Sequence, residues 1–168
     1  MNPFPMLAGY NAWANRRLYD AAAKLTDEQY RADTGLFFRS LHGTLNHILV
    51  GDRIWQKRFT GEGEAPDRLD AILHDDLPGL RAAREAEDHR ITGWVATLDE
   101  AALARTFSYR RVTTPEPVTQ PLGPALVHFF NHQTHHRGQC HAGLTRLVGE
   151  APEFDLIYFQ RESGMGMS

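Results

Sequence analysis

The sequence is short of cysteine, of long hydrophobic runs and of excess basic charge, and each shortage excludes a class of protein. Its single cysteine, Cys140, can form no internal disulfide, which fits a reducing compartment. No apolar run approaches the ~20 residues of a membrane span, and the amino terminus lacks the pattern of a secretory signal. The 21 acidic and 18 basic residues are interspersed and give a net charge of −3. We therefore expect a cytoplasmic protein that binds neither nucleic acid nor membranes.

Repeats, low-complexity tracts and long linkers are also missing, so we expect residues 1–168 to form a single domain. Hydrophobic residues make up 42% of the chain and charged residues 23%, a balance typical of globular proteins. A chain of this length buries roughly two thirds of the surface that its unfolded form exposes. No disulfide or metal ion is needed merely to fold it.

Apolar residues recur at spacings of three and four in four long segments, which predicts four amphipathic helices. The segments are 4–25, 40–60, 77–98 and 121–149, and a short helix is predicted at 156–161. Ser40 suits the start of the second helix and Gly149 the end of the fourth. Residues 105–122 combine strand formers with a proline-containing turn.

The predicted fold class is therefore all-α: a four-helix bundle with a long crossover that contains a short β-hairpin between helices three and four. An irregular α+β fold is the alternative.

Histidine is concentrated in the fourth helix, where "HFFNHQTHHRGQCH" (128–141) holds five of the nine. At about 100° per residue, His136 lies within the apolar face and His132 at its edge, one turn apart. The other three point progressively away from this face: His128, His135 and His141. Only the pair His132 and His136 is expected to face the interior.

Two imidazoles at positions i and i+4 can bind the same divalent ion, but a site needs at least a third ligand. His47 in the second helix is the best candidate, because Gly51, one turn later, leaves room for a close approach. His42 lies on a more polar side and is the weaker candidate. Three histidines from two facing helices would leave open coordination positions, as reactive metal sites do.

These residues also have structural interpretations. An HxxxH pair is more often two imidazoles hydrogen-bonded to their neighbours than a metal site, and Cys140 is more simply a small buried hydrophobe than a fourth ligand. Asp52 interrupts an apolar seam, where an unpaired charge is costly, so it requires a partner. Arg84 from the polar middle of the third helix is the expected one.

Three segments together resemble the DinB family, the DinB and YfiT-like metalloenzymes: "NAWANRRLYDAAAKL" (11–25), "LHGTLNHILVGDRIW" (41–55) and "HFFNHQTHHRGQ" (128–139). The resemblance implies a four-helix bundle, usually dimeric, in which three histidines hold a divalent ion such as zinc or nickel. Matched by motif, the implied ligands are His47, His132 and His136. Members of the wider superfamily transfer small thiols such as bacillithiol or mycothiol, and others have been labelled hydrolases.

Two reactions are compatible with such a site. A hydrolase needs a base beside the metal, yet no acidic residue occurs between Leu122 and Val148, which leaves Asp52 or Glu87 as candidates. A transferase that joins a small-molecule thiol to an electrophilic substrate needs no dedicated base, because a metal ion lowers the pKa of a coordinated thiol. We therefore expect a thiol S-transferase. The alternatives are a metal-dependent hydrolase, a non-catalytic metal-binding protein and a metal-free helical interaction module.

Overall fold

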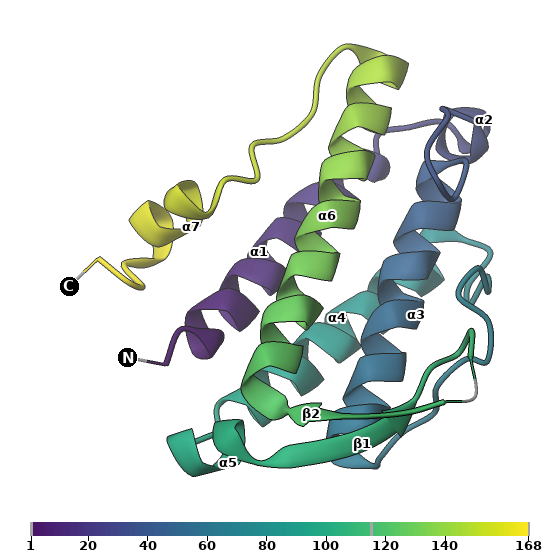
Figure 1. The fold of residues 1–168 in the computed structure, drawn as a ribbon. Helices are drawn as coiled ribbons and strands as arrows, with labels where there is room; N and C mark the ends of the chain where they lie inside the picture. Colours follow the sequence, from purple (N-terminus) through teal and green to yellow (C-terminus); the bar gives the residue numbers. More distant parts are fainter. Residues whose placement is uncertain (1, 115, 168) are drawn as a thin grey trace.

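The computed structural model describes residues 2–114 and 116–167, and this part of the chain is mostly helical with a small antiparallel sheet (Figure 1). The elements follow in the order α1 (Phe4–Ala22), α2 (Asp27–Arg31), α3 (Leu41–Thr60), α4 (Leu77–Val95), α5 (Glu100–Ala104), β1 (Thr106–Arg110), β2 (Pro117–Pro121), α6 (Leu122–Val148) and α7 (Leu156–Ser163). The predicted predominance of helix is confirmed, and so is the hairpin before the last long helix.

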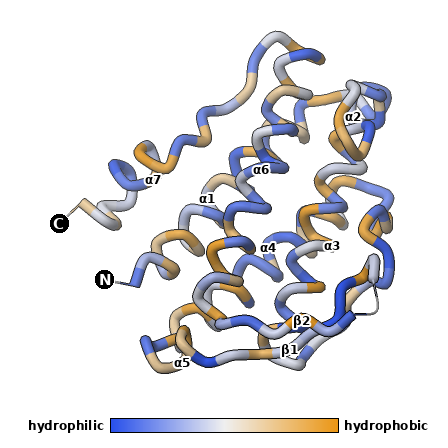
Figure 2. Tube along the Cα trace, viewed as in Figure 1, coloured by the Kyte–Doolittle hydropathy of each residue, from blue (hydrophilic) through white to orange (hydrophobic). Residues whose placement is uncertain are grey.

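Helices α1, α3, α4 and α6 pack against one another lengthwise, α1 with α4 and α6, and α3 with the same two helices (Figure 1). Hydrophobic and hydrophilic residues alternate along each of them (Figure 2). The apolar side chains form one cluster around Trp55, Phe59 and Phe129 and a second around Leu18, Leu45 and Leu144. Both clusters place α3 directly against α6, the two helices that carry the candidate histidines.

A layer of buried polar side chains joins the helices. Asp52 of α3 accepts hydrogen bonds from Arg84 Nη1 at 2.5 Å and from Gln133 Nε2 at 2.6 Å, and all three residues are buried. Arg84 also pairs with Asp88, at 3.0 Å. The predicted pairing of Asp52 with Arg84 is therefore confirmed, and it ties α3 to α4 while Gln133 ties α3 to α6.

The helix boundaries follow the capping residues. The Ser40 hydroxyl accepts a hydrogen bond from Gly43 N at the start of α3, and Gly149 ends α6 in the left-handed region at φ 80°. The predicted first helix was too long: it ends at Ala22, because Leu25 N bonds the Ala22 carbonyl in a turn. The third helix likewise ends at Val95 rather than at residue 98.

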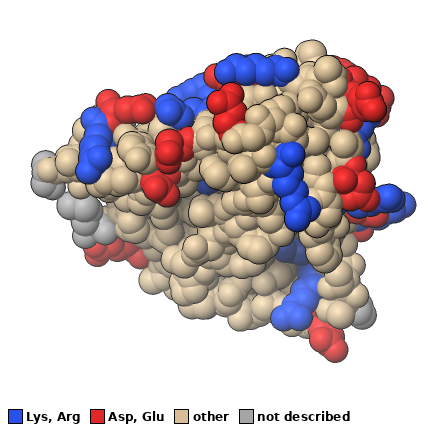
Figure 3. All heavy atoms as spheres, turned by 90° about the horizontal axis from the view of Figure 1, so that it is seen from above, with Lys and Arg blue, Asp and Glu red and all other residues tan. Residues whose placement is uncertain are grey.

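Two five-residue helices, α2 and α5, were not predicted, since both are too short to show a periodic apolar pattern. Between residues 2 and 167, leaving out 115, none of the helices combines the length and the apolar character that crossing a membrane would take. Viewed from above, the molecule shows basic and acidic side chains scattered among each other on a largely uncharged surface (Figure 3).

Candidate metal centre

Three histidines from α3 and α6 converge at the interface between these helices. His47 Nε2 lies 3.1 Å from His136 Nε2 and 3.3 Å from His132 Nε2. One nitrogen of each ring lies within 4.8 Å of those of the other two, close enough for all three to hold the same metal ion. The sequence-based expectation that these three side chains meet is confirmed.

Hydrogen bonds orient two of the rings for ligation. His47 Nδ1 lies 2.7 Å from the Leu69 carbonyl oxygen, which can only accept, so Nδ1 carries the proton and Nε2 keeps its lone pair. His136 Nδ1 likewise lies 2.8 Å from Gln139 Oε1. Both Nε2 lone pairs then face each other across 3.1 Å, an arrangement that is repulsive on its own and attractive around a cation. The donor set therefore fits a divalent ion.

The electrostatic environment keeps these imidazoles neutral, as metal ligands must be. Burial lowers the pKa of His47 to about 4, although its bond to Leu69 opposes this. Burial, and secondarily the neighbouring His136, lowers the pKa of His132 to about 3. The pKa of His136 is lowered by the same desolvation. Near pH 7 no proton competes with a metal ion for the ring nitrogens.

Gly51 makes the close approach possible, as expected from the sequence. A Cβ atom on this residue would lie 2.9 Å from His132 Cε1, closer than real side chains approach one another. On the other side of the site, the Phe38 ring stacks on His47, with ring centroids 3.7 Å apart and planes 18° apart. His47 thus lies between the α3–α6 interface, which Gly51 keeps narrow, and the ring of Phe38 in the loop before α3.

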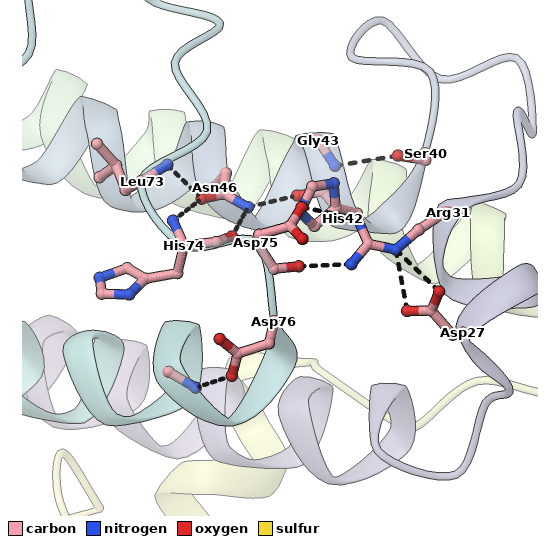
Figure 4. A network of polar contacts seen from close by, with 11 residues as sticks. Asp27, Arg31, Ser40, His42, Gly43, Asn46, Leu73, His74, Asp75 and Asp76 are labelled. Atoms are coloured by element: carbon pink, nitrogen blue, oxygen red, sulfur yellow. Dashed lines mark hydrogen bonds and ion pairs between the residues drawn. The ribbon is translucent and has the colours of Figure 1, made fainter.

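The loop that supplies the Leu69 carbonyl is itself fixed to α3 by Asn46 (Figure 4). Asn46 Oδ1 accepts from the backbone N–H groups of Leu73 at 2.8 Å and His74 at 3.1 Å, and its Nδ2 donates to the His74 carbonyl. Arg31 holds the same loop by pairing with Asp75 at 3.0 Å. The residue preceding a candidate ligand therefore positions that ligand's hydrogen-bond partner.

A cleft of about 210 Å³ opens beside the centre. His47, Gly51 and His132 line it together with further residues of α3, the 61–76 loop, the segment after β1 and α6: Ile54, Trp55, Arg58, Leu69, Arg111, Val112, Thr113 and His128. Among the residues described, the lining contains two arginines and no carboxylate. Two of the three candidate ligands, His47 and His132, therefore border a space that can hold a small molecule.

The other residues considered from the sequence are not members of the ligand group. His42 is buried against Tyr30 rather than on a polar surface, with ring centroids 5.3 Å apart. His135 and His141 are exposed, as expected, whereas His128 lines the cleft. Cys140 is fully buried in the second apolar cluster and is not in the ligand group, in keeping with its apolar interpretation.

Three supporting groups were missed from the sequence: the Leu69 carbonyl, Gln139 and Phe38. The spacing of Gln139, three residues after His136 on the same helix, could have revealed it, because such residues are neighbours on the helix surface. The other two lie in irregular segments and leave no periodic signal.

Comparison with known proteins agrees with this geometry. The sequence model of the DinB family matches residues 1–163. Protein DinB of Bacillus subtilis (strain 168) is 26% identical over 143 residues, which cover 80% of this chain and 80% of that protein. The comparison with solved structures gives no match. The match over nearly the whole chain, together with the converging histidines, shows that this protein belongs to the DinB family.

Proposed function

We propose that this protein is a divalent-metal-dependent transferase that joins a small-molecule thiol to an electrophilic substrate. His47, His132 and His136 would hold the metal, with zinc or nickel the expected ion because imidazole nitrogens suit both. A divalent ion bound there would lower the pKa of a coordinated thiol and present it as a thiolate. The cleft beside the triad would hold the two substrates.

The observation that carries this proposal is the absence of any carboxylate from the described lining of the cleft. Hydrolysis ordinarily requires a general base within reach of the attacking water. The two candidates named from the sequence are engaged elsewhere: Asp52 with Arg84 and Gln133, and Glu87 with Arg90 at 3.2 Å. Thiol transfer makes no such demand, so this reaction is favoured over the hydrolase alternative.

The same cleft favours a reactive centre over simple metal storage. A saturated site would need a fourth protein ligand, and in the described part of the chain the ligand group comprises three histidines only. Cys140, the other candidate, is turned into the apolar core. His47 and His132 instead border the cleft, so open coordination positions would face a space that substrate can enter.

What the chain's own residues contribute is orientation and exclusion of water. The Leu69 carbonyl and Gln139 fix the proton on Nδ1 of His47 and His136, and so aim both Nε2 atoms at the shared position. Ile54, Trp55 and Val112 give the cleft an apolar wall. Such a wall strengthens electrostatic interactions inside the site.

The quaternary organisation belongs to the same proposal. We place the four long helices in a four-helix bundle and the active protein in a homodimer, on the strength of the family relationship. A dimer contact needs exposed apolar side chains, and among the residues described α1 and α3 carry no large ones. In the described residues the large exposed hydrophobic side chains lie elsewhere, among them Phe37, which is 80% exposed, and Val127 of α6.

The test is a transfer assay on metal-loaded protein. Wild type and His136→Ala are incubated with a panel of small thiols and an electrophile such as chlorodinitrobenzene, and the thioether is measured. We expect product in wild type and none above background in the variant. Ester hydrolysis without thiol transfer by the wild type would refute the proposal in favour of the hydrolase.

A further inference from the structure

The cleft beside the histidines carries an uncompensated positive charge that the proposed reaction does not use. Arg58 of α3 lies on its wall, with its guanidinium carbon 4.6 Å from the ring centroids of both Trp55 and Tyr109. Its Nη2 donates to the Arg110 carbonyl at 3.0 Å. The guanidinium is thereby held in place by aromatic rings and a neutral carbonyl.

Arg58 differs in this respect from the arginines of the chain that form ion pairs. Seven arginines pair with carboxylates: Arg17, Arg31, Arg39, Arg53, Arg68, Arg81 and Arg90, and the buried Arg84 pairs with two. Among the residues described, no carboxylate lies within 4.0 Å of Arg58 or of Arg111 across the cleft. Burial lowers the pKa of Arg58, which shows how little nearby negative charge offsets its desolvation.

The helix geometry aims this charge along the cleft towards the histidines. His47 and Arg58 are eleven positions apart on α3, about three turns and about 20° around the axis, with Gly51 and Ile54 between them on the same face. Long side chains on a helix lean towards its amino terminus, so Arg58 leans towards His47. The rise of about 16 Å between the two residues sets the scale of the distance, so a ligand that touches both ends of the cleft must be an extended chain.

We propose that Arg58, assisted by Arg111, binds an anionic group, a carboxylate or a phosphate, on a small molecule whose other end reaches His47, His132 and His136. This inference rests on the proposed function and names its substrate class: at least one of the two substrates is an anion that extends along the cleft. The apolar wall between the two ends suits an uncharged middle segment.

Matched thiols test the proposal. Mercaptooctanoate and mercaptooctanol differ only in their far end, and their binding to cobalt-loaded protein is followed by the thiolate-to-cobalt absorption band. We expect wild type to bind the carboxylate about tenfold more tightly, as a charge-assisted hydrogen bond predicts. Mercaptoacetate is too short to span the distance and should gain nothing over mercaptoethanol.

Variants assign the preference to one residue. Arg58→Gln should reduce the ratio between the two octyl thiols to about one, and Arg58→Lys should keep part of it, since the charge remains while the planar fork is lost. Lys57→Gln removes an equal charge from the neighbouring exposed position and should keep the full ratio. Thermal melts of all variants verify folding. Equal binding of both thiols by wild type, or a ratio unchanged in Arg58→Gln and in the double variant with Arg111→Gln, would overturn the proposal.

The same variants show which substrate carries the anion and separate this inference from the proposed function. Transfer is measured with a charged and a neutral thiol, and with iodoacetate against iodoacetamide. If Arg58→Gln no longer distinguishes the charged from the neutral member of one pair, that pair identifies the substrate that carries the anion. If the variant distinguishes the members of both pairs as wild type does, the assignment of Arg58 is contradicted. If the octyl thiols bind with the expected ratio while no transfer occurs, the anion subsite stands and the transferase proposal fails.

Discussion

Replacing Gly51 by alanine should weaken metal binding without weakening the fold. The two properties can therefore be measured separately in one variant. The added Cβ would lie 2.9 Å from His132 Cε1, whereas ordinary contacts begin at 3.4 Å, so the imidazole must move by about 0.5 Å. Metal–ligand distances tolerate about 0.2 Å. The displaced ring can then no longer satisfy the same ion as the other two histidines.

Metal affinity should fall about 10- to 100-fold, or by about 1.4 to 2.8 kcal/mol, as it does when one ligand of a site is weakened. Alanine in a helix interior is otherwise more favourable than glycine by about 0.5 to 1 kcal/mol. The metal-free variant should therefore be about as stable as wild type, with a loss of at most a few tenths of a kcal/mol, because the His132 ring can rotate away from the added methyl group.

The assay is a zinc titration against a chelating indicator, paired with urea unfolding of the metal-free proteins. Gly138→Ala is the matched control: this glycine lies on α6 two positions after His136, and a Cβ there would meet nothing within 4 Å. The control should gain the helix propensity and keep wild-type affinity. Wild-type zinc affinity in Gly51→Ala would refute the reasoning that this glycine sets the distance between the ligand helices.

Three further predictions concern the surroundings of the site. Asn46→Ala should cost about 1 to 3 kcal/mol in urea unfolding, because two backbone N–H groups of the loop lose their acceptor, and should weaken zinc binding through the freed Leu69 carbonyl; unchanged affinity would contradict that link. Arg84→Met should destabilise the protein by about 3 to 5 kcal/mol by leaving the buried Asp52 without its cationic partner, whereas a loss below about 1 kcal/mol would contradict the buried pair. Burial raises the pKa of Cys140 to about 12, so its thiol should resist iodoacetamide until the protein unfolds; and because the unfolded thiol ionises first, stability should fall as pH rises above about 9, which unfolding curves at several pH values can check.

Helical periodicity made the centre predictable. His132 and His136 lie one turn apart on a face that also carries Phe129 and Leu144, so the helix places both rings at the core, and Gly51 indicated where α3 comes close. What could not be predicted is the support from the 61–76 loop. A carbonyl such as that of Leu69 belongs to the backbone, and no residue type marks the position where it bends towards a histidine.

One of the two short helices could have been predicted from its sequence, whereas the end of α1 could not. Helix α2 has a capping box, in which the Thr26 hydroxyl accepts from Gln29 N and the Gln29 side chain accepts from Thr26 N. This threonine-x-x-glutamine spacing is legible in the sequence. The stop of α1 at Ala22 was not, because Leu25 continues the apolar period from a turn and still packs against the core.

The central claim, that three histidines hold one divalent ion, is tested most directly by elemental analysis of untagged protein. Wild type should contain one equivalent of a divalent transition metal per chain, and His136→Ala should contain almost none. His141→Ala, which alters an exposed imidazole elsewhere on the same helix, should match wild type. Stoichiometric metal in His136→Ala, or wild-type protein that takes up no zinc or nickel when both are supplied, would contradict the claim.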